Sequence, residues 1–195
     1  MAPVLQFLTW QLRLREAATE TSRIERDELA RFARGRSRLV EIGVAQGVTT
    51  KRLRSGMAPD GELWAVDPYF PNRLGLRFSE LIAKGEVSSV ENGSVRWVRT
   101  TGVEAAALWK REGRPAPDFV FIDGDHSWQG IEGDWSAWSA LVAPGGIIGL
   151  HDSRPMPKFP VDADSVRFTR DIVHHDPRFR VVAEIESLTV VERSA

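Results

Sequence analysis

The sequence contains no cysteine among its 195 residues. That absence excludes a disulfide framework, a metal or iron–sulfur site built on thiolates, and catalysis by a cysteine nucleophile. A large charge of one sign is missing as well, because 26 Lys and Arg residues stand against 27 Asp and Glu residues and leave a net charge of −1. Such a balance is not typical of proteins whose main task is to grip nucleic-acid phosphates or an anionic membrane surface.

Long apolar runs are also missing. The longest uncharged stretch, residues 135–150, is interrupted by a Pro-Gly-Gly sequence and is too short to cross a bilayer. The first ten residues are apolar, but no basic region precedes them, so they make a poor signal peptide. We therefore expect a cytoplasmic protein that acts without a membrane or nucleic-acid partner.

The patterns that are present indicate alternating strands and helices. Residues 5–34 are rich in helix formers and predict a helical N-terminal extension over residues 1–36. From residue 39 onward, short apolar runs alternate with amphipathic stretches, which is typical of βαβ units in a mostly parallel sheet with helices on both faces. The predicted strands are residues 39–44, 63–66, 95–98, 119–122 and 147–150, and the predicted helices are residues 49–57, 103–109 and 131–142.

The end of the sequence differs from this alternation. Two β-rich runs, residues 179–185 and 188–191, are separated by two residues and predict an antiparallel hairpin at one edge of the sheet. The expected fold class is therefore α/β: a Rossmann-like, doubly wound sheet, mostly parallel, with a C-terminal antiparallel β-hairpin and the N-terminal helical extension. We expect residues 1–195 to form a single domain whose core is residues 37–192, long enough to bury a full hydrophobic core.

A glycine turn at residues 43–47 follows the first predicted strand. Asp67 ends the second strand, 20 residues beyond Gly47, where a carboxylate can accept hydrogen bonds from two ribose hydroxyls. A dinucleotide fingerprint needs glycines at two further positions, and here these hold Ala45 and Val48. The pattern favours a nucleoside without a diphosphate, such as S-adenosylmethionine, over NAD or FAD. A turn with only a structural role is the alternative.

Several blocks of the sequence resemble class I S-adenosylmethionine-dependent methyltransferases. Residues 40–50 are similar to the acidic-x-Gly-x-x-x-Gly form of that family's first motif, and residues 122–128 read Ile-Asp-Gly-Asp-His-Ser-Trp. Asp-Trp at residues 134–135, Leu-Val-Ala-Pro-Gly-Gly at residues 141–146 and His-Asp at residues 151–152 follow in the family's order. The resemblance covers about residues 37–192. It is strongest to the small-molecule O-methyltransferase branch, which includes macrolide sugar O-methyltransferases and cephalosporin-hydroxylase-like proteins.

This resemblance implies where the cofactor binds. The methionine end of S-adenosylmethionine would lie near Glu41 and the glycine turn, and its ribose near Asp67. The adenine would lie near Thr101, a position where related proteins often have an acidic residue. The expected cofactor-binding residues are Glu41, Gly43, Gly47, Asp67, Thr101 and Asp123.

Asp123 and Asp152 end the fourth and fifth predicted strands. If these strands are neighbours, their tips lie about 4.8 Å apart, and the two carboxylates can bind one divalent cation such as Mg²⁺. The resemblance also implies a metal held by acidic residues at these positions. His151 stands where related proteins often have another acidic residue, and this favours Mn²⁺, Fe²⁺ or no metal at all. The alternative is that both aspartates only cap their loops.

His126 is the expected general base, with Asp123 as the second catalytic residue. Methyl transfer to a hydroxyl needs an oxygen that loses its proton, and an imidazole with a pKa of about 6.5 accepts a proton at neutral pH. The resemblance places a catalytic histidine at this position. The alternative is that His126 only satisfies backbone groups of its turn.

Aromatic residues and two loops surround this expected site. Trp128, Trp135 and Trp138 recur at helical spacing, which is typical of a helix face packed on the sheet. For Trp135 and Trp138 this packing is expected rather than a platform for substrate, whereas Trp128, which begins the helix beside the site, is open to either role. The loops at residues 68–77 and 153–160 border the site, and we expect them to cover the cofactor.

Together these features predict an S-adenosylmethionine-dependent O-methyltransferase that acts on a hydroxyl of a small molecule, such as a sugar or a secondary metabolite. An NAD-type oxidoreductase and a protein that binds S-adenosylmethionine without catalysis are the alternatives. An iron oxygenase with His and Asp ligands has support only from the naming of the related branch. Because 195 residues leave no room for a cap domain, we expect a small acceptor or a pocket completed in a homo-oligomer through the N-terminal helices.

Overall fold

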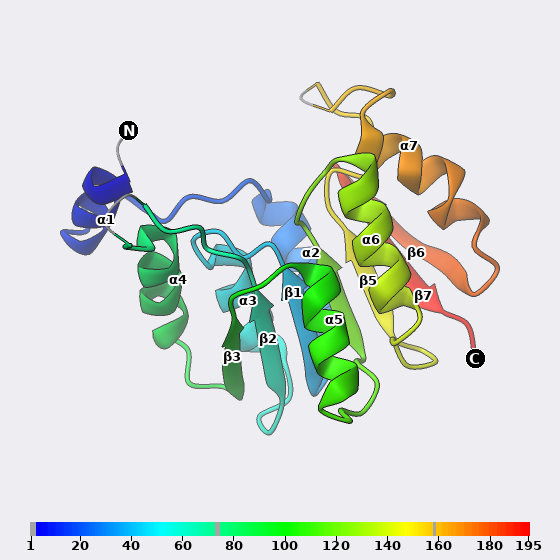
Figure 1. The fold of residues 1–195 in the computed structure, drawn as a ribbon, viewed down its shortest axis with the longest axis horizontal. Coiled ribbons are helices and arrows are strands. Elements are labelled where there is room, and N and C mark those ends of the chain that lie inside the picture. The colour runs from blue at the N-terminus through cyan, green and yellow to red at the C-terminus, as the bar shows by residue number, and fades with distance from the viewer. Residues whose placement is uncertain (1–2, 73–74, 158) are drawn as a thin grey trace.

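A computed structural model describes residues 3–72, 75–157 and 159–195. It contains one seven-stranded sheet with the strand order β3-β2-β1-β4-β5-β7-β6 (Figure 1). The first five strands run parallel, and the last two form an antiparallel hairpin at the edge next to β5. The strands are β1 (Arg38–Ile42), β2 (Glu62–Val66), β3 (Ser94–Val98), β4 (Phe119–Ile122), β5 (Ile147–Leu150), β6 (Phe179–Ile185) and β7 (Leu188–Arg193). This architecture confirms the fold class expected from the sequence.

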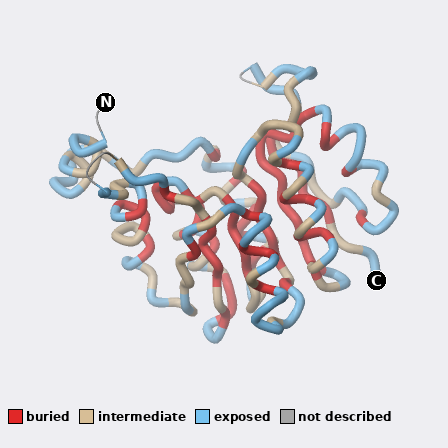
Figure 2. Tube along the Cα trace, in the orientation of Figure 1, coloured by how far each residue is buried: buried red, intermediate tan, exposed pale blue. Residues whose placement is uncertain are grey.

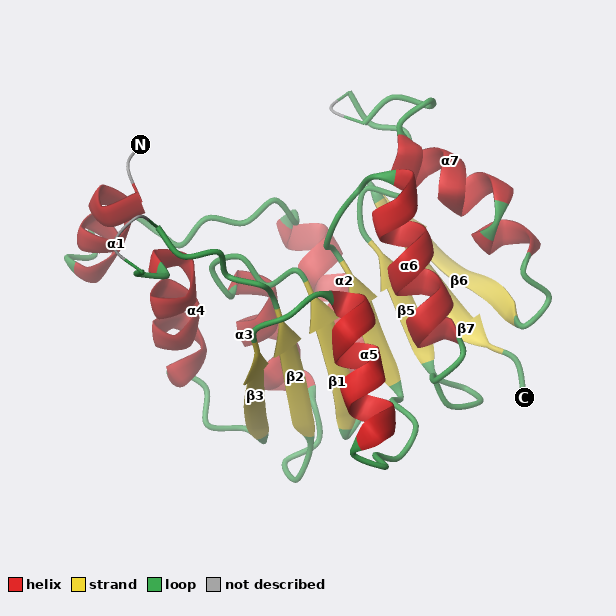
Figure 3. Ribbon diagram, viewed as in Figure 1, coloured by secondary structure: helices red, strands yellow, loops and turns green. Residues whose placement is uncertain are grey.

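Helices cover both faces of the sheet. In Figure 3, α5 and α6 lie in front of the strands and α2 and α3 lie behind them, while α4 packs beside α3 and α7 beside α6. The helices are α1 (Pro3–Gln11), α2 (Arg23–Ala33), α3 (Val48–Gly56), α4 (Phe78–Ser88), α5 (Gly102–Arg111), α6 (Trp128–Ser139) and α7 (Asp164–Asp171), and a 3₁₀ turn follows at Val173–His175. None of these helices in the described part of the chain is long and apolar enough to cross a membrane.

Each face of the sheet has its own hydrophobic core, because side chains alternate along a strand. On β1, Val40 and Ile42 belong to the core under α5 and α6, whereas Leu39 belongs to the core under α2 and α3. Figure 2 shows that the buried residues concentrate along the strands and the inner helix faces. Trp135 and Trp138 of α6 are buried against the sheet, as their spacing predicted.

The N-terminal extension is less helical than its composition indicated. Two short helices replace the long helical segment, and residues 12–22 between them pass over the carboxyl ends of the strands (Figure 1). Helix α2 begins where Ser22 and Glu25 form a capping box, in which each side chain accepts a hydrogen bond from the backbone N–H of the other. The cap explains why the helix starts at Arg23.

Helix α4 was not predicted. A glycine in its middle, Gly85, weakens the helical pattern, but the structure shows why this residue is small. A Cβ atom at Gly85 would lie 2.2 Å from the ring of Trp10, so the glycine lets α1 pack against α4.

Candidate functional site

A cavity of about 650 Å³ opens at the carboxyl edge of the parallel strands. Its volume lies within the range of roughly 300–1,000 Å³ that small-molecule sites occupy, and its position at the strand ends is the usual place for ligands in such sheets. Loops after the five parallel strands line it, together with residues 18–21 of the N-terminal extension. Of the expected site residues, Gly43, Asp67, Thr101, Asp123 and His126 lie on its wall.

The glycine turn after β1 brings two parts of the backbone into close approach. Gly43 has φ +86°, and a Cβ atom there would lie 1.9 Å from the carbonyl oxygen of Asp123. Gly47 has φ +78° and is the N-cap of α3, where a Cβ atom would lie 2.8 Å from the Cα of Ala83. Gly43 lines the cavity, whereas Gly47 lies behind the wall. A side chain at Gly43 would clash with the backbone of Asp123, and one at Gly47 would clash with Ala83, so each position requires glycine.

Asp67 is at the end of β2 as expected, but its carboxylate already holds the turn. Its Oδ2 accepts hydrogen bonds from the backbone N–H groups of Val44 and Ala45, at 3.1 and 3.0 Å, and its Oδ1 accepts one from Tyr69, at 2.8 Å. A carboxylate has about four acceptor positions, so one position on Oδ1 is left for a ligand hydroxyl. Asp67 thus shapes the cavity in addition to lining it.

Glu41 lies away from the cavity wall. It precedes Ile42 on β1, and only Ile42 points to the cavity, because neighbouring side chains of a strand point to opposite faces. The Glu41 side chain is fully buried, and neither of its oxygens has a hydrogen-bond partner among the described residues. Burial raises the pKa of Glu41 well above its usual range.

Thr101 lies on the cavity wall, but its side chain caps the N-terminus of α5. Its hydroxyl accepts a hydrogen bond from the backbone N–H of Glu104, and the Glu104 carboxylate accepts one from the backbone N–H of Thr101. The hydroxyl therefore has a structural task at the place where the sequence suggested an adenine contact.

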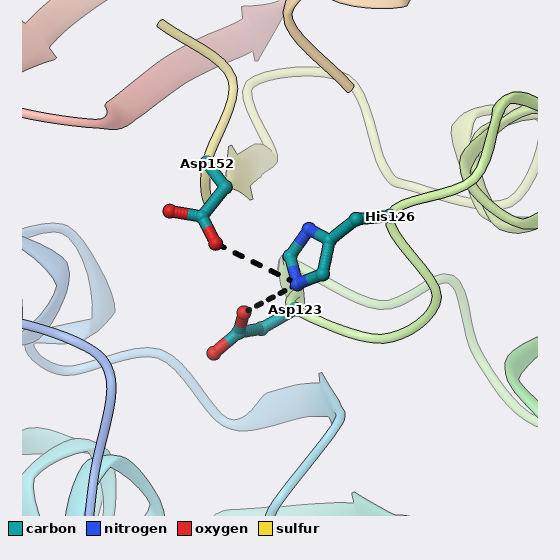
Figure 4. Close-up of side chains that lie close together, drawn as sticks. All are labelled: Asp123, His126 and Asp152. Atoms are coloured by element: carbon teal, nitrogen blue, oxygen red, sulfur yellow. Dashed lines mark ion pairs between the residues drawn. The ribbon is translucent and has the colours of Figure 1, made fainter. Parts of the chain in front are cut away.

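The two aspartates and the histidine expected to carry the chemistry come together. Strands β4 and β5 are neighbours, so Asp123 and Asp152 lie side by side at their ends (Figure 4). Nε2 of His126 is 3.7 Å from Oδ1 of Asp123 and 3.7 Å from Oδ2 of Asp152. The three ligand atoms lie within 4.8 Å of one another. Burial raises the pKa of Asp123 against the opposing effect of the neighbouring histidines.

His151 joins this cluster from below, and the sequence did not indicate its role. The ring is buried, with Nδ1 2.9 Å from Oδ1 of Asp123 and 3.4 Å from Oδ2 of Asp152. Its other nitrogen, Nε2, is 3.4 Å from Oε2 of Glu25 on α2. Burial alone would lower the pKa of His151, but the three carboxylates raise it to about 12, so the ring is a buried cation.

The sequence did not indicate that Glu25 belongs to this cluster either. The Ser22–Glu25 spacing marks it only as a helix cap, yet its carboxylate also accepts hydrogen bonds from the backbone N–H and the hydroxyl of Ser187, at 2.9 and 2.6 Å. Burial opposes ionisation, but the hydrogen bonds from His151, Ser187 and Ser22 lower the pKa of Glu25 to about 2. The N-terminal extension thereby supplies an anion beneath the site.

The donor set fits a divalent cation. Asp123 and Asp152 offer carboxylate oxygens, and His126 offers Nε2. Mixed nitrogen and oxygen donors suit Mn²⁺, Fe²⁺ or Zn²⁺ better than Mg²⁺, which prefers oxygen alone.

The two bordering loops contribute one aromatic side chain each. Phe70 lines the cavity while its side chain is largely exposed, and the ring of Phe159 lies 5.5 Å from the ring of His126. Residues 73, 74 and 158 of these loops lie outside the described residues. His174 and His175 lie far along the chain in the 3₁₀ turn, and neither lines the cavity.

Comparisons with known proteins agree with this geometry. A family model described as a methyltransferase domain matches residues 40–153. The solved O-methyltransferase from Bacillus cereus, in complex with SAH, is 17% identical over 98% of this chain and 90% of that chain, with a TM-score of 0.69. The O-methyltransferase TomG from Streptomyces achromogenes, involved in tomaymycin synthesis and solved with SAM, is 17% identical over 100% and 91% of the two chains, with a TM-score of 0.69.

A third similar structure has a different described role. A putative rRNA-methylase from Clostridium thermocellum is 12% identical over 91% of this chain and 99% of that chain, with a TM-score of 0.65. At these identities the likeness extends to the fold, and the acceptor has to be argued from the site.

Proposed function

The chain belongs to the family of methyltransferase domains, and from this premise we propose that it transfers the methyl group of S-adenosylmethionine to a hydroxyl of a small molecule. The observation that carries the proposal is the position of His126 beside Asp123 and Asp152 at one end of the cavity. A base next to a nucleoside-sized cavity is what methylation of a hydroxyl requires. Family membership leaves no support for the oxidoreductase alternative.

His126 is proposed to accept the proton of the acceptor's hydroxyl group. The acceptor oxygen attacks the sulfonium methyl, the new O–CH₃ bond forms as the S–CH₃ bond breaks, and that electron pair stays on sulfur. The hydroxyl proton passes to Nε2 of His126, where the two aspartates stabilise the imidazolium. The His126 side chain is 34% exposed, so it can return the proton to solvent. The rest of the catalysis is alignment of two bound molecules.

A divalent cation would be held by the carboxylates of Asp123 and Asp152, whereas the imidazolium of His151 beside them has no lone pair to offer. When bound, such an ion lowers the pKa of a hydroxyl that it contacts and fixes its orientation. His126 is then left free to take the proton. Carboxylate oxygens of this kind suit Mg²⁺ or Mn²⁺.

The acceptor is proposed to be small. A cavity of about 650 Å³ that also holds the cofactor leaves room for a modest molecule. An RNA acceptor, as in the name of the rRNA-methylase from Clostridium thermocellum, would call for an excess of basic groups that neutralise phosphates. The net charge here is −1. Residues 1–195 are proposed to act as one domain, because Glu25 of the extension contacts both His151 and Ser187.

Calorimetric titration tests the cofactor. We expect S-adenosylmethionine and S-adenosylhomocysteine to bind and NAD not to bind, with and without Mn²⁺. Tight NAD binding without any response to either sulfur nucleoside would overturn the proposal.

Transfer is tested with tritium-labelled S-adenosylmethionine and a panel of hydroxylated acceptors: sugars, glycosides and phenols. Labelled product is expected with at least one acceptor and not with the His126→Ala protein. Binding of the cofactor without transfer to any acceptor of the panel would support the non-catalytic alternative instead.

A further inference from the structure

A second cavity, of about 790 Å³, lies outside the candidate active site. One face of α3 lines it, where Val48, Lys51 and Ser55 recur at the spacing of helical turns. Residues 13–17, which belong to the connection between α1 and α2, line it as well. Its cationic side chains come from this connection, from α2 and from α3, and we call the cavity the basic groove after them: Arg13, Arg15, Arg26, Lys51 and Arg52.

Two of these five cations are paired with neighbouring carboxylates. Nζ of Lys51 is 3.1 Å from Oε2 of Glu86. Nη2 of Arg52 is 2.8 Å from Oδ1 of Asp27. The other three cations form no ion pair with a carboxylate in the part of the chain that the structure describes: Arg13, Arg15 and Arg26.

Backbone carbonyl groups hold two of the unpaired arginines. Nε of Arg15 donates a hydrogen bond to the carbonyl oxygen of Glu16 at 3.2 Å, and Nη1 of Arg26 donates one to the carbonyl oxygen of Thr21. Both arginines are half-buried. A guanidinium group has five N–H donors, so each keeps donors for a ligand. Because these side chains are already ordered, binding costs less conformational entropy than it would for free surface arginines.

The charge and the size of the groove point to a small polyanion. Three unpaired arginines stand against Glu16, the carboxylate that remains unpaired among the described lining residues, and leave a charge of +2. Guanidinium forks match pairs of phosphate oxygens. The volume lies within the range of small-molecule sites, and the net charge of −1 for the whole chain does not favour a nucleic-acid strand.

The candidate active site has the opposite character. Among the described residues that line its cavity, none is Lys or Arg. Carboxyl groups are frequent on its wall: Glu20, Asp67, Asp123, Asp125 and Asp134. Such a wall repels a polyphosphate, so the two cavities suit ligands of different charge.

We propose that the basic groove binds a small anion with two or three consecutive phosphate groups, held by Arg13, Arg15 and Arg26, at a site separate from the candidate active site. The phosphate groups can belong to a nucleotide or to a free oligophosphate, because both present the same oxygen atoms to the arginines. The proposal does not depend on methyl transfer, since none of these arginines lines the first cavity.

Calorimetry at about 50 mM salt, where charge screening is modest, tests the site with sodium tripolyphosphate as the probe. The unmodified protein is compared with Arg15→Gln, Arg26→Gln and the control Arg34→Gln. Arg34 is exposed at the C-cap of α2 and lies outside the groove, so its replacement removes the same charge elsewhere. Saturable binding is expected in the unmodified protein and the control. Each of the other two variants should bind about tenfold or more weakly, the loss of charge-assisted hydrogen bonds.

ATP serves as the second probe and distinguishes the sources of the phosphates. Binding of ATP about tenfold or more tighter than tripolyphosphate would assign the groove to a nucleotide, and equal affinities would assign it to a free oligophosphate; either result supports the site. If Arg26→Gln does not fold, Arg13→Gln replaces it, with the same loss expected.

Three results would overturn the site. They are the absence of saturable tripolyphosphate binding, equal weakening in Arg15→Gln and Arg34→Gln, and binding of a single-stranded RNA hexamer without binding of tripolyphosphate. The test uses no S-adenosyl compound. Its failure therefore leaves the proposed function standing, and failure of the cofactor titration leaves the basic groove standing.

Discussion

Oε2 of Glu25 lies 3.4 Å from Nε2 of His151, so a helix of the N-terminal extension holds a histidine at the tip of β5. Both side chains are almost fully buried, and the opposite nitrogen of His151 faces Asp123 and Asp152. The extension is thus connected electrostatically to the candidate active site. Charge on α2 supports the orientation of the groups that flank His126.

Replacing Glu25 should destabilise the protein. Glu25→Gln removes the anion and leaves a buried imidazolium with fewer partners, and breaking such a pair costs about 3 kcal/mol or more. Urea unfolding of Glu25→Gln and of Glu28→Gln, a matched change on the same helix where the ion pair with Arg31 is partly exposed, measures the difference. The control should lose less than about 1 kcal/mol. Equal losses would contradict the buried network.

The contact between Glu25 and His151 also predicts that the free energy of unfolding falls at acid pH. The pKa of Glu25 is about 2 in the folded protein against 4.5 ordinarily. Its stabilisation is therefore complete above pH 4.5 and is lost as the pH falls towards 2, by about 3 kcal/mol in total. Unfolding free energies measured from pH 6 to pH 2 should fall less steeply in Glu25→Gln. A slope equal to that of the unmodified protein would count against this assignment.

The glycine turn offers a comparison of two alanine substitutions. Gly43 and Gly113 both have positive φ, but a Cβ atom at Gly43 would meet the backbone of Asp123, whereas one at Gly113 would meet nothing within 4 Å. Gly113→Ala should cost about 1–2 kcal/mol, the backbone strain alone. Gly43→Ala should cost several kcal/mol more or prevent folding, since backbone must move. Thermal unfolding of both variants measures this, and similar melting temperatures would refute the close approach.

Asp134→Asn should stabilise the unliganded protein at neutral pH. The pKa of Asp134 is raised from 3.8 to about 6, so ionising it costs folded-state stability that grows as the pH rises from 3.8 to 6, up to about 3 kcal/mol. Melting temperatures should therefore rise in the variant at pH 7.5 and differ little at pH 4. A variant that is less stable at pH 7.5 would mean that the carboxylate has a protein partner.

Asp152→Asn tests the candidate cation site with little disturbance of the backbone. Asp152 has φ +48°, and asparagine tolerates this left-handed region well. If Asp152 binds the ion, affinity for Mn²⁺, followed by electron paramagnetic resonance of the free ion, should fall by at least about tenfold, the loss expected even for outer-shell partners. Unchanged Mn²⁺ binding in the variant would remove Asp152 from the ligand set.

His126→Ala should separate catalysis from binding. Loss of the base is expected to lower kcat by about 10²–10⁴ with the acceptor that the panel identifies, while the calorimetric affinity for S-adenosylhomocysteine stays the same. His175→Ala, in the 3₁₀ turn, is the control and should keep full kcat. A His126→Ala protein with unaltered kcat would assign the proton to another group.

The sequence predicted the strand ends well because they depend on local patterns. β4 and β5 have the predicted bounds, and the expected aspartates follow them, Asp123 directly after β4 and Asp152 two residues after β5. The meeting of Asp123 with Asp152 then follows from the adjacency of the two strands. Motif spacing also placed His126 correctly beside them.

Other parts of the site depend on burial and tertiary contact, which a pattern does not contain. Glu41 and Ile42 are neighbours on β1, yet only Ile42 faces the cavity. Glu25 reads as a cap from its spacing, but its second task requires the distant Ser187. Asp134 lies in a motif next to Trp135, and only the folded structure shows that it is buried at the wall of the cavity.

The bond from Ser187 to Glu25 joins residues 162 positions apart. During synthesis on the ribosome, Glu25 has no hydroxyl or N–H from the β6–β7 hairpin to meet until that hairpin has left the exit tunnel. His151 likewise lacks its finished surroundings in any shorter nascent chain. The surroundings of His151 are therefore completed only when the β6–β7 hairpin is in place, and a product without this hairpin would carry the sequence motifs without the buried contacts of Glu25.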